Sequence, residues 1–444
     1  MPRGAGVAEL ADALDSKSGS RKGVGVRAPP PVPNSTHHPH IERSGIADLA
    51  MAQEIMRRVP TQWIPQASWT EAQLSFKVLP PLDSMKATDF LFCGFFLIAL
   101  NPWLSMAQTP SANLPDPDGQ PADMQQPVQV FILLGQSNML GFGKVKGDKD
   151  GTLEYATSKK KLYPYLVDAD GQWTQRMDVR NVRVMGSGLG GSRLLLNEWM
   201  TIKGGNIGPE IGIGHHLGEA MDAPIMVLKS CIGNRALGWD LLPPGSEGFE
   251  FTDEKGVTWV HPGYKGTPER WQKGTDPEKI NWYAGMQYDG DVSRAKEVLK
   301  DLPKHYPEAK RYEIAGFFWW QGDRDSRSAA LSSRYEKNLV HLIKQLRADF
   351  DAPNAAFVCA SLGQTEEGSE DNGGTILKAM MAVDGKSGKY PEFKNNVAAV
   401  YTHPLSKGGS SGGHYGGHAE TYMNVGEAMG KAMVQLLALT ASTP

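Results

Sequence analysis

Five residues of the chain have the types and positions that ester hydrolysis by a serine requires. This chemistry needs a nucleophilic hydroxyl, a base that takes its proton, an acid group that orients the base, and hydrogen-bond donors for the oxyanion. Ser137 directly follows an apolar run, so its hydroxyl would be exposed at the turn into the next helix. Gly233 could bring a backbone N–H close to a substrate, because no side chain protrudes from its Cα. Gln321 offers a side-chain amide, Asp323 a carboxylate and His414 an imidazole.

Short apolar runs must position these residues. The run 128–135 stops abruptly at a glycine and a polar triplet, which is typical of a strand buried on both faces. Four similar runs follow, at 224–230, 314–320, 355–360 and 396–401. Stripes of apolar residues with helical spacing occur at 292–302, 331–350 and 422–436. Strands that alternate with helices predict an α/β fold, a three-layer sandwich with a five-stranded parallel sheet. The five candidate residues would then gather at the carboxyl ends of its strands.

Each candidate, taken alone, also has a purely structural explanation. A serine after a strand is often a turn or N-cap residue, and Gln321 could be a structural amide. Asp323 or Asp325 could cap the following helix, and His414 and His418 could be ordinary loop residues. The catalytic interpretation rests on the whole set, because all five candidates fall at strand ends or in loops that should meet there.

The interval 239–291 contains four tryptophans among many glycines and prolines, and we interpret it as an aromatic-rich loop insertion. Exposed tryptophan rings could stack on the apolar faces of sugar rings. The same rings could instead attach a long loop to the domain. The pattern does not separate these two functions.

Composition limits the classes of partner. The chain has 444 residues, of which 40% are hydrophobic and 21% charged, enough for one large or two ordinary domains. Lys and Arg number 46 and Asp and Glu 49, so the net charge of −3 gives no reason to propose nucleic acid or an anionic membrane as partner. A neutral or weakly charged substrate is the expectation. A single domain, residues 128–440, holds all five strands.

The residues before this domain predict export. Residues 1–84 are rich in proline and histidine and are expected to be disordered, as a wrongly assigned upstream extension with translation starting at Met85. Residues 85–107 have the anatomy of a signal peptide, with a membrane-anchoring or buried helix as the alternative. Residues 108–127 are typical of a linker. The mature protein would be secreted or periplasmic without a stable membrane anchor. There, Cys231 and Cys359 could form a disulfide or remain buried thiols.

Several stretches resemble the conserved blocks of SGNH-type esterases. They are Gly-Gln-Ser-Asn-Met at 135–139, Trp-Gln-Gly-Asp at 320–323 and the loop around His414. The resemblance is closest to carbohydrate esterase family 6 and the sialate O-acetylesterase group, and it covers about residues 128–437, with further similar stretches at 207–210, 282–289 and 414–422. It implies the flavodoxin-like fold of SGNH hydrolases. It also implies deacetylation of acetylated polysaccharides or oligosaccharides, such as acetylxylan, without a metal or other cofactor.

The resemblance also implies a role for each candidate. Ser137 would be the nucleophile and His414 the general base, with Asp323 as the orienting acid. Gly233 and Gln321 would complete an oxyanion hole with the Ser137 N–H.

Four more residues receive secondary roles. Asn138 would brace the nucleophile turn, and Gln136 beside it is a second supporting residue. Arg235 and Trp239 are candidates for substrate binding.

Two departures from the family pattern affect the acid. The motif usually continues with Glu where this chain has Asp323, and an Asp is common at the position of Ser411, three residues before His414. Glu420 and Asp325 therefore remain alternative acids.

His418 remains an alternative base. The leading hypothesis is a secreted acetylxylan-type esterase. The alternatives are a sialate or other sugar O-acetylesterase, or a carbohydrate-binding module with a decayed active site.

Overall fold

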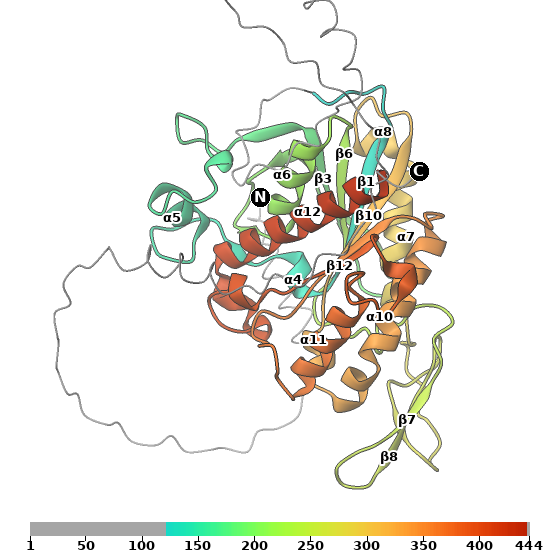
Figure 1. Cartoon of the computed structure of the whole chain (residues 1–444). Helices are drawn as coiled ribbons and strands as arrows, with labels where there is room; N and C mark the ends of the chain where they lie inside the picture. The colour runs from blue at the N-terminus through green and yellow to red at the C-terminus, as the bar shows by residue number, and fades with distance from the viewer. Residues whose placement is uncertain (1–120, 442–444) are drawn as a thin grey trace, which may run out of the picture. The chain divides into compact units, whose positions relative to one another are not determined.

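The computed structural model describes residues 121–441 (Figure 1). The predictions for residues 1–84 and for the signal peptide 85–107 lie outside the described residues. Of the predicted linker, residues 121–127 are described and contain no helix or strand, and the first strand begins at Val128. Among the described residues, no helix combines the length and apolar character needed to cross a bilayer.

A seven-stranded sheet forms the centre of the fold, in the order β12-β11-β10-β1-β6-β3-β4. All five predicted strands are present: β1 (Val128–Gly135), β6 (Ile225–Ser230), β10 (Tyr312–Trp320), β11 (Ala356–Ala360) and β12 (Val397–Val400). These five pair in parallel. Numbered along the chain, their spatial order is 5-4-3-1-2, which is the flavodoxin-like order. The topological switch point therefore lies between β1 and β10.

The predicted number of five strands is wrong, because two more strands extend the sheet beyond β6. They are β3 (Gln175–Met185), parallel to β6, and β4 (Arg193–Thr201), antiparallel to β3. Both contain charged and partly buried residues. Strands near the edge of a sheet keep one side partly in solvent, so they lack the unbroken apolar run by which central strands are recognised.

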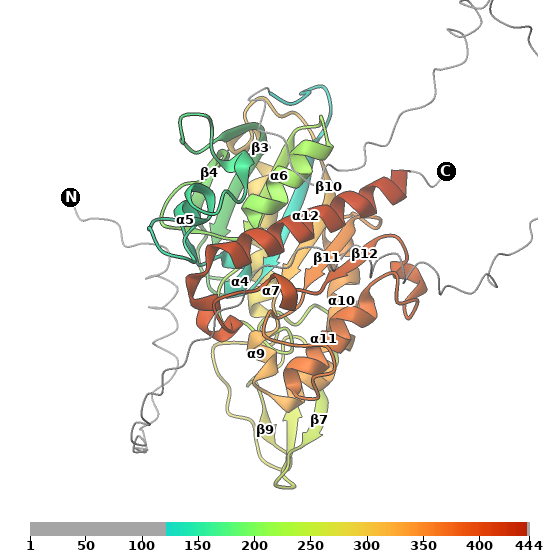
Figure 2. The same ribbon diagram turned by 60° about the vertical axis from the view of Figure 1, so that its left-hand side comes forward.

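Two hydrophobic clusters lie on opposite faces of the sheet, since successive side chains of a strand point to opposite faces. Phe131 and Leu133 of β1 belong to the cluster that contains the buried residues of α6 (Glu210–Ala220) and α12 (Ala419–Ala441). Val130 and Ile132 belong to the other cluster, with residues of α7 (Met286–Lys300), α10 (Ala329–Asp349) and α11 (Asn372–Val383). Helices therefore cover both faces, and Figure 2 shows α6 and α12 side by side on one of them. The three helical stripes predicted from the sequence are confirmed by α7, α10 and α12.

Short elements connect these parts. The helical ones are α4 (Ser137–Leu140), α5 (Leu153–Ser158), η2 (Pro164–Leu166), α8 (Leu302–His305), α9 (Asp323–Ser326), η3 (Pro391–Phe393), η4 (His403–Leu405) and η5 (Ser411–Gly417). Strands β2 (Gly143–Lys144) and β5 (Asn206–Ile207) pair antiparallel.

The interval 239–291 is not only a loop. It contains a three-stranded antiparallel sheet of β7 (Phe249–Thr252), β8 (Thr258–His261) and β9 (Trp271–Gln272), and β7 and β8 project from the main sheet in Figure 1. The strands are only two to four residues long, too short for a periodic pattern to be recognised. Cys231 and Cys359 are both buried free thiols, so they do not form a disulfide with each other.

Candidate active site

Ser137 lies at the switch point of the sheet, as the first residue of α4. The turn before it requires glycine, because Gly135 has a φ of +143° and a Cβ there would lie 2.4 Å from the carbonyl oxygen of Trp320. This close approach of β1 and β10 lets the Gln136 N–H donate to the same oxygen, at 3.3 Å. Ser137 is 7% exposed, and its hydroxyl makes no hydrogen bond with a described residue.

Gly233, in the loop after β6, lies directly beside Ser137. A Cβ built on Gly233 would be 3.6 Å from the Cβ of Ser137, so the two residues are in van der Waals reach. Neither backbone N–H has a hydrogen-bond acceptor among the described residues. The structure thus brings together the predicted nucleophile and two N–H groups that could stabilise an oxyanion.

Gln321 is buried and its amide is already engaged. The Nε2 group donates to Asp325 Oδ2 at 2.6 Å, to the Arg235 carbonyl at 2.8 Å and to Gln136 Oε1 at 3.1 Å. The Oε1 atom accepts from the Tyr335 hydroxyl at 2.9 Å. Two amide hydrogens therefore face three acceptors. In this conformation Gln321 connects the loops after β1, β6 and β10, and its role as an oxyanion donor stays a prediction.

Asp325, an alternative orienting acid, holds the loop after β6 by hydrogen bonds. Its carboxylate accepts from the backbone N–H groups of Leu237 at 2.9 Å and Gly238 at 2.8 Å, besides the Gln321 amide. Burial raises the pKa of Asp325 to about 6. These contacts explain Asp325 as a structural group that holds two loops of the site together.

Asp323 lies against the loop that carries His414. Its Oδ1 accepts a hydrogen bond from the Ser411 hydroxyl at 2.7 Å, and a Cβ on Gly412 would be 3.4 Å from the same oxygen. The other carboxylate oxygen pairs with Arg327 at 2.5 Å. The predicted orienting acid therefore lies against Ser411 and Gly412, which precede the predicted base by three and two residues, although Asp323 is far from them in the sequence.

His414 has a backbone φ of +51°, which is uncommon for a residue with a side chain. Its imidazole stacks on the Phe142 ring, with centroids 4.0 Å apart and planes inclined by 5°. The Tyr422 hydroxyl donates to the His414 carbonyl at 3.3 Å. Because Ser137 makes no hydrogen bond with a described residue, the imidazole must approach the hydroxyl before it can take its proton.

Asn138 and Tyr415 join the nucleophile turn to the His414 loop. The Asn138 amide donates to the buried Tyr415 hydroxyl at 3.4 Å, and the Gly363 N–H donates to the same oxygen at 3.1 Å. Gln136 contributes on the other side of Ser137, since its Oε1 accepts from Gln321. Both predicted supporting residues thus connect the Ser137 turn to neighbouring loops.

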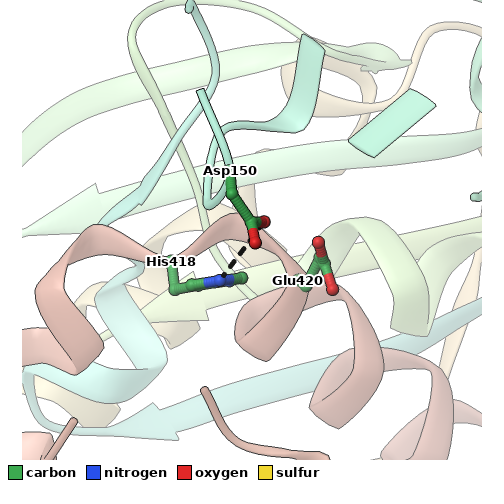
Figure 3. A group of neighbouring side chains, drawn as sticks. All are labelled: Asp150, His418 and Glu420. Carbon is green, nitrogen blue, oxygen red and sulfur yellow. Dashed lines mark ion pairs between the residues drawn. The ribbon is translucent and has the colours of Figure 1, made fainter. Parts of the chain in front are cut away.

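His418, the alternative base, belongs to a separate charged group (Figure 3). Its Nε2 lies 3.8 Å from Asp150, and ligand atoms of Asp150, His418 and Glu420 all lie within 4.8 Å of one another. Lys160 bonds to both carboxylates and Lys407 bonds to Glu420 at 2.5 Å. Burial lowers the pKa of His418. The two lysines balance the carboxylates, so a metal ion would have to displace them, and the Glu420 carboxylate is engaged by both lysines.

Arg235 and Trp239 were predicted to bind substrate. The Arg235 guanidinium lies over the Trp282 ring at 5.2 Å and donates to the Ser187 hydroxyl at 3.1 Å. Trp239 is 6% exposed and belongs to a small hydrophobic cluster. Its ring therefore packs the loop against the domain and has little surface left for stacking on a sugar.

Four residues near the site were not found as functional partners from the sequence. Arg327 could have been found, because it follows Asp323 by four residues, the spacing at which helical side chains meet. Phe142 and Tyr415 gave no signal, since their contacts depend on how α4 meets the His414 loop. Ser411 attracted notice as a departure from the family pattern, but not as the partner of Asp323.

Residues 256–435 match the model of a family described as carbohydrate esterase, sialic acid-specific acetylesterase (SASA). The matched segment contains Gln321, Asp323 and His414, whereas Ser137 and Gly233 precede it. The match supports a carbohydrate esterase, and it favours the sialate-type alternative over the acetylxylan esterase assignment. No curated protein matches the chain.

Three solved structures are similar at low sequence identity. A protein from Arabidopsis thaliana has 17% identity and a TM-score of 0.41, with 69% of this chain and 98% of that chain covered. A carbohydrate acetylesterase from Xanthomonas citri has 13% identity and a TM-score of 0.42, with 68% and 55% covered. NanS has 16% identity and a TM-score of 0.34, with 64% and 79% covered. All three TM-scores are below 0.5, so these similarities do not indicate a function.

Proposed function

We propose that the protein is a serine esterase that removes O-acetyl groups from acetylated carbohydrates. The observation that carries this proposal is the contact of Asp323 with the His414 loop, at the edge of the sheet where Ser137 and Gly233 also lie. The predicted acid, the loop of the predicted base and the predicted nucleophile come from distant parts of the chain to this edge, beside two N–H groups that have no acceptor among the described residues. The family match over residues 256–435 supports the same class.

The proposed reaction proceeds through an acyl-enzyme. His414 takes the proton of the Ser137 hydroxyl as the oxygen attacks the acetyl carbonyl, and Asp323 orients the loop of the base. The N–H groups of Ser137 and Gly233 stabilise the negative charge on the carbonyl oxygen. The sugar alcohol leaves with the proton from His414. A water molecule, activated by His414, then releases acetate and restores Ser137.

We propose an O-acetylated sialic acid or a related acetylated sugar as the substrate. The description of the matched family favours this class over acetylated xylan, to which the sequence blocks also have a resemblance. We further propose that the protein acts outside the cytoplasm, because residues 85–107 have the pattern of a signal peptide. An N-terminus near Gln108 in the secreted protein would support export with translation from Met85, and peptides from residues 1–84 would contradict that start site.

Hydrolysis of p-nitrophenyl acetate tests the mechanism. The wild-type protein should release p-nitrophenol, and Ser137→Ala should lower the rate by at least about a thousandfold. Equal rates would exclude Ser137 as the nucleophile.

Acetate release from O-acetylated sialic acid and from acetylated xylan, measured side by side, tests the substrate. We expect the higher kcat/KM on the sialic acid. Carbohydrate binding without turnover of any ester would instead indicate a binding module with a decayed site.

A further inference from the structure

A second polar cavity lies beside the nucleophile helix, on the face of the sheet that α6 covers. Its volume is about 400 Å³, and the charged or amide side chains of β3, β4, α6 and β6 that line it are Asn181, Arg183, Asn197, Glu198, Glu210 and Lys229. The exposed glycines 204 and 205 lie at its rim. Ser137, Gly233 and His414 do not line it. The cavity is therefore distinct from the candidate active site, although Gly141, just after α4, reaches it.

Two donors in this cavity lack partners. Nε and Nη2 of Arg183 are buried and make no hydrogen bond within the described chain. Asn181, two residues earlier on β3 and so on the same face of the sheet, is 3% exposed, and no described residue hydrogen-bonds to its side chain. Buried polar groups are nearly always hydrogen-bonded, because desolvation without a partner costs free energy. The two buried nitrogens of Arg183 that have no partner among the described residues, with the Asn181 amide beside them on one wall, indicate a ligand with acceptor atoms.

The other charges of the cavity are paired. Lys229 Nζ lies 2.5 Å from Glu210 Oε2 and donates to the Leu140 carbonyl at 3.1 Å. Glu198 pairs through Oε2 with Lys203. Among the cations that line the cavity, Arg183 is therefore the one without a counter-ion in the described part of the chain. A bound anion would be that counter-ion.

The second oxygen of Glu198 narrows the chemistry of the ligand. Oε1 of Glu198 is buried and has no hydrogen-bond partner in the described part of the chain. A carboxylate oxygen accepts hydrogen bonds and repels a second anion, so it would face a donor of the ligand. Sulfate has no hydrogen-bond donor to offer Glu198. A molecule with a carboxylate at one end and hydroxyls at the other satisfies all three side chains.

We propose that this cavity binds a small sugar acid. The carboxylate lies on the Arg183 guanidinium and accepts from the Asn181 amide, and a ring hydroxyl donates to Glu198 Oε1. The volume is in the range of cavities that hold small molecules. This site is independent of hydrolysis at Ser137. The net charge of −3 does not exclude an acidic ligand, because recognition depends on the local charge around the cavity.

Titration calorimetry on the full chain tests the proposal with D-glucuronate, D-glucose, acetate and sulfate. Glucuronate should bind at least about tenfold more tightly than glucose, which has the same ring without the carboxylate, since a hydrogen bond to a charged group is worth that factor or more. Acetate and sulfate should be weaker, because they offer no hydroxyl to Glu198. Equal affinity for sulfate and glucuronate would overturn the proposal and leave only a general anion site.

Variants locate the binding. Arg183→Met should lower glucuronate affinity at least about tenfold, and Arg183→Lys should lower it less, because it keeps the charge but loses the fork of donors. Asn181→Asp should weaken binding, because the new carboxylate has nearly the shape of the amide but repels the carboxylate of the ligand. The control is Arg193→Met, the same substitution at an exposed position of β4 that does not line the cavity.

Hydrolysis of p-nitrophenyl acetate separates this site from the catalytic one. Arg183→Met and Asn181→Asp should keep the wild-type rate, and Ser137→Ala should keep glucuronate binding. If Arg183→Met does not fold, as judged by circular dichroism, the glucuronate affinities of Arg183→Lys and Asn181→Asp test the proposal. Unchanged glucuronate affinity in the folded variants would overturn the proposal.

Discussion

The hydroxyl of Ser411 donates a 2.7 Å hydrogen bond to Oδ1 of Asp323, although 88 residues separate them in the sequence. Ser411 also accepts from the Gln364 amide at 3.1 Å, so it lies in a chain of hydrogen bonds that ends at the Asp323 carboxylate. Ser411 stands three residues before His414, where the SGNH-type esterases that the sequence resembles often have an aspartate. Asp323, the first residue of α9, brings a carboxylate to this position, and its role as the orienting acid stays a prediction.

Removal of this hydroxyl should weaken catalysis more than stability. Ser411→Ala leaves Asp323 with one fewer donor and releases the start of η5 from it. We expect kcat for p-nitrophenyl acetate to fall about tenfold or more, with a small change in KM, because a neutral-to-charged hydrogen bond contributes about that factor. Ser410→Ala, at the exposed neighbouring position, is the matched control. Equal kcat in the two variants would exclude a role for Ser411 in positioning the base.

Asp323 and Asp325, two of the three candidate acids, should respond differently to the same substitution. Asp323→Asn can still accept from Ser411 but lacks the charge, so kcat should fall by a factor of about 100 to 10,000 while the melting temperature changes little. Asp325→Asn places an amide against the N–H groups of Leu237 and Gly238, which should lower the melting temperature by several degrees. Steady-state kinetics and thermal unfolding on both variants distinguish them. The opposite pattern would assign the orienting role to Asp325.

The stacked pair of Phe142 and His414 should control the position of the imidazole. Phe142→Ala removes the ring that lies 4.0 Å from the imidazole, so His414 gains rotational freedom. We expect kcat to fall about tenfold, since stacked rings contribute about 0.5 to 1.5 kcal/mol beyond burial. Phe142→Tyr keeps the ring and should restore most of the rate. If both variants retain wild-type kcat, the stacking has no catalytic role.

The stability of the protein should depend on pH through Asp291. Burial raises the pKa of Asp291 to about 7 in the folded protein, above the ordinary value of 3.8. Between these two pH values the folded state binds the proton that the unfolded state has lost, so the free energy of unfolding decreases as pH rises. The decrease is about 1.4 kcal/mol for each unit of pKa difference.

Asp291→Asn tests this dependence, because an amide does not titrate and its oxygen can still accept from Gln287 and Arg294. Urea unfolding of wild type and variant at pH 4, 6 and 8 should show a smaller loss of stability with pH in the variant. If the free energy of unfolding changes with pH in the same way in both proteins, the pH dependence does not come from Asp291.

The amino-acid sequence by itself determined the central strands, the three long helices and the position of Ser137. Hydrophobic periodicity is a local property, and a fully buried strand or an amphipathic helix is visible in a short stretch of sequence. Glycine at 135 and the apolar run before it were therefore enough to place a serine at the end of β1.

The tertiary structure decided the partners. The addition of β3 and β4 to the sheet depends on pairing between distant strands. The contact of Asp323 with Ser411 and the engagement of the Gln321 amide depend on which loops meet at the switch point of the sheet. The lack of a partner for two Arg183 nitrogens among the described residues likewise depends on where the other charges lie. These contacts join residues far apart in the sequence, and a local pattern contains no information about the pairing of distant side chains.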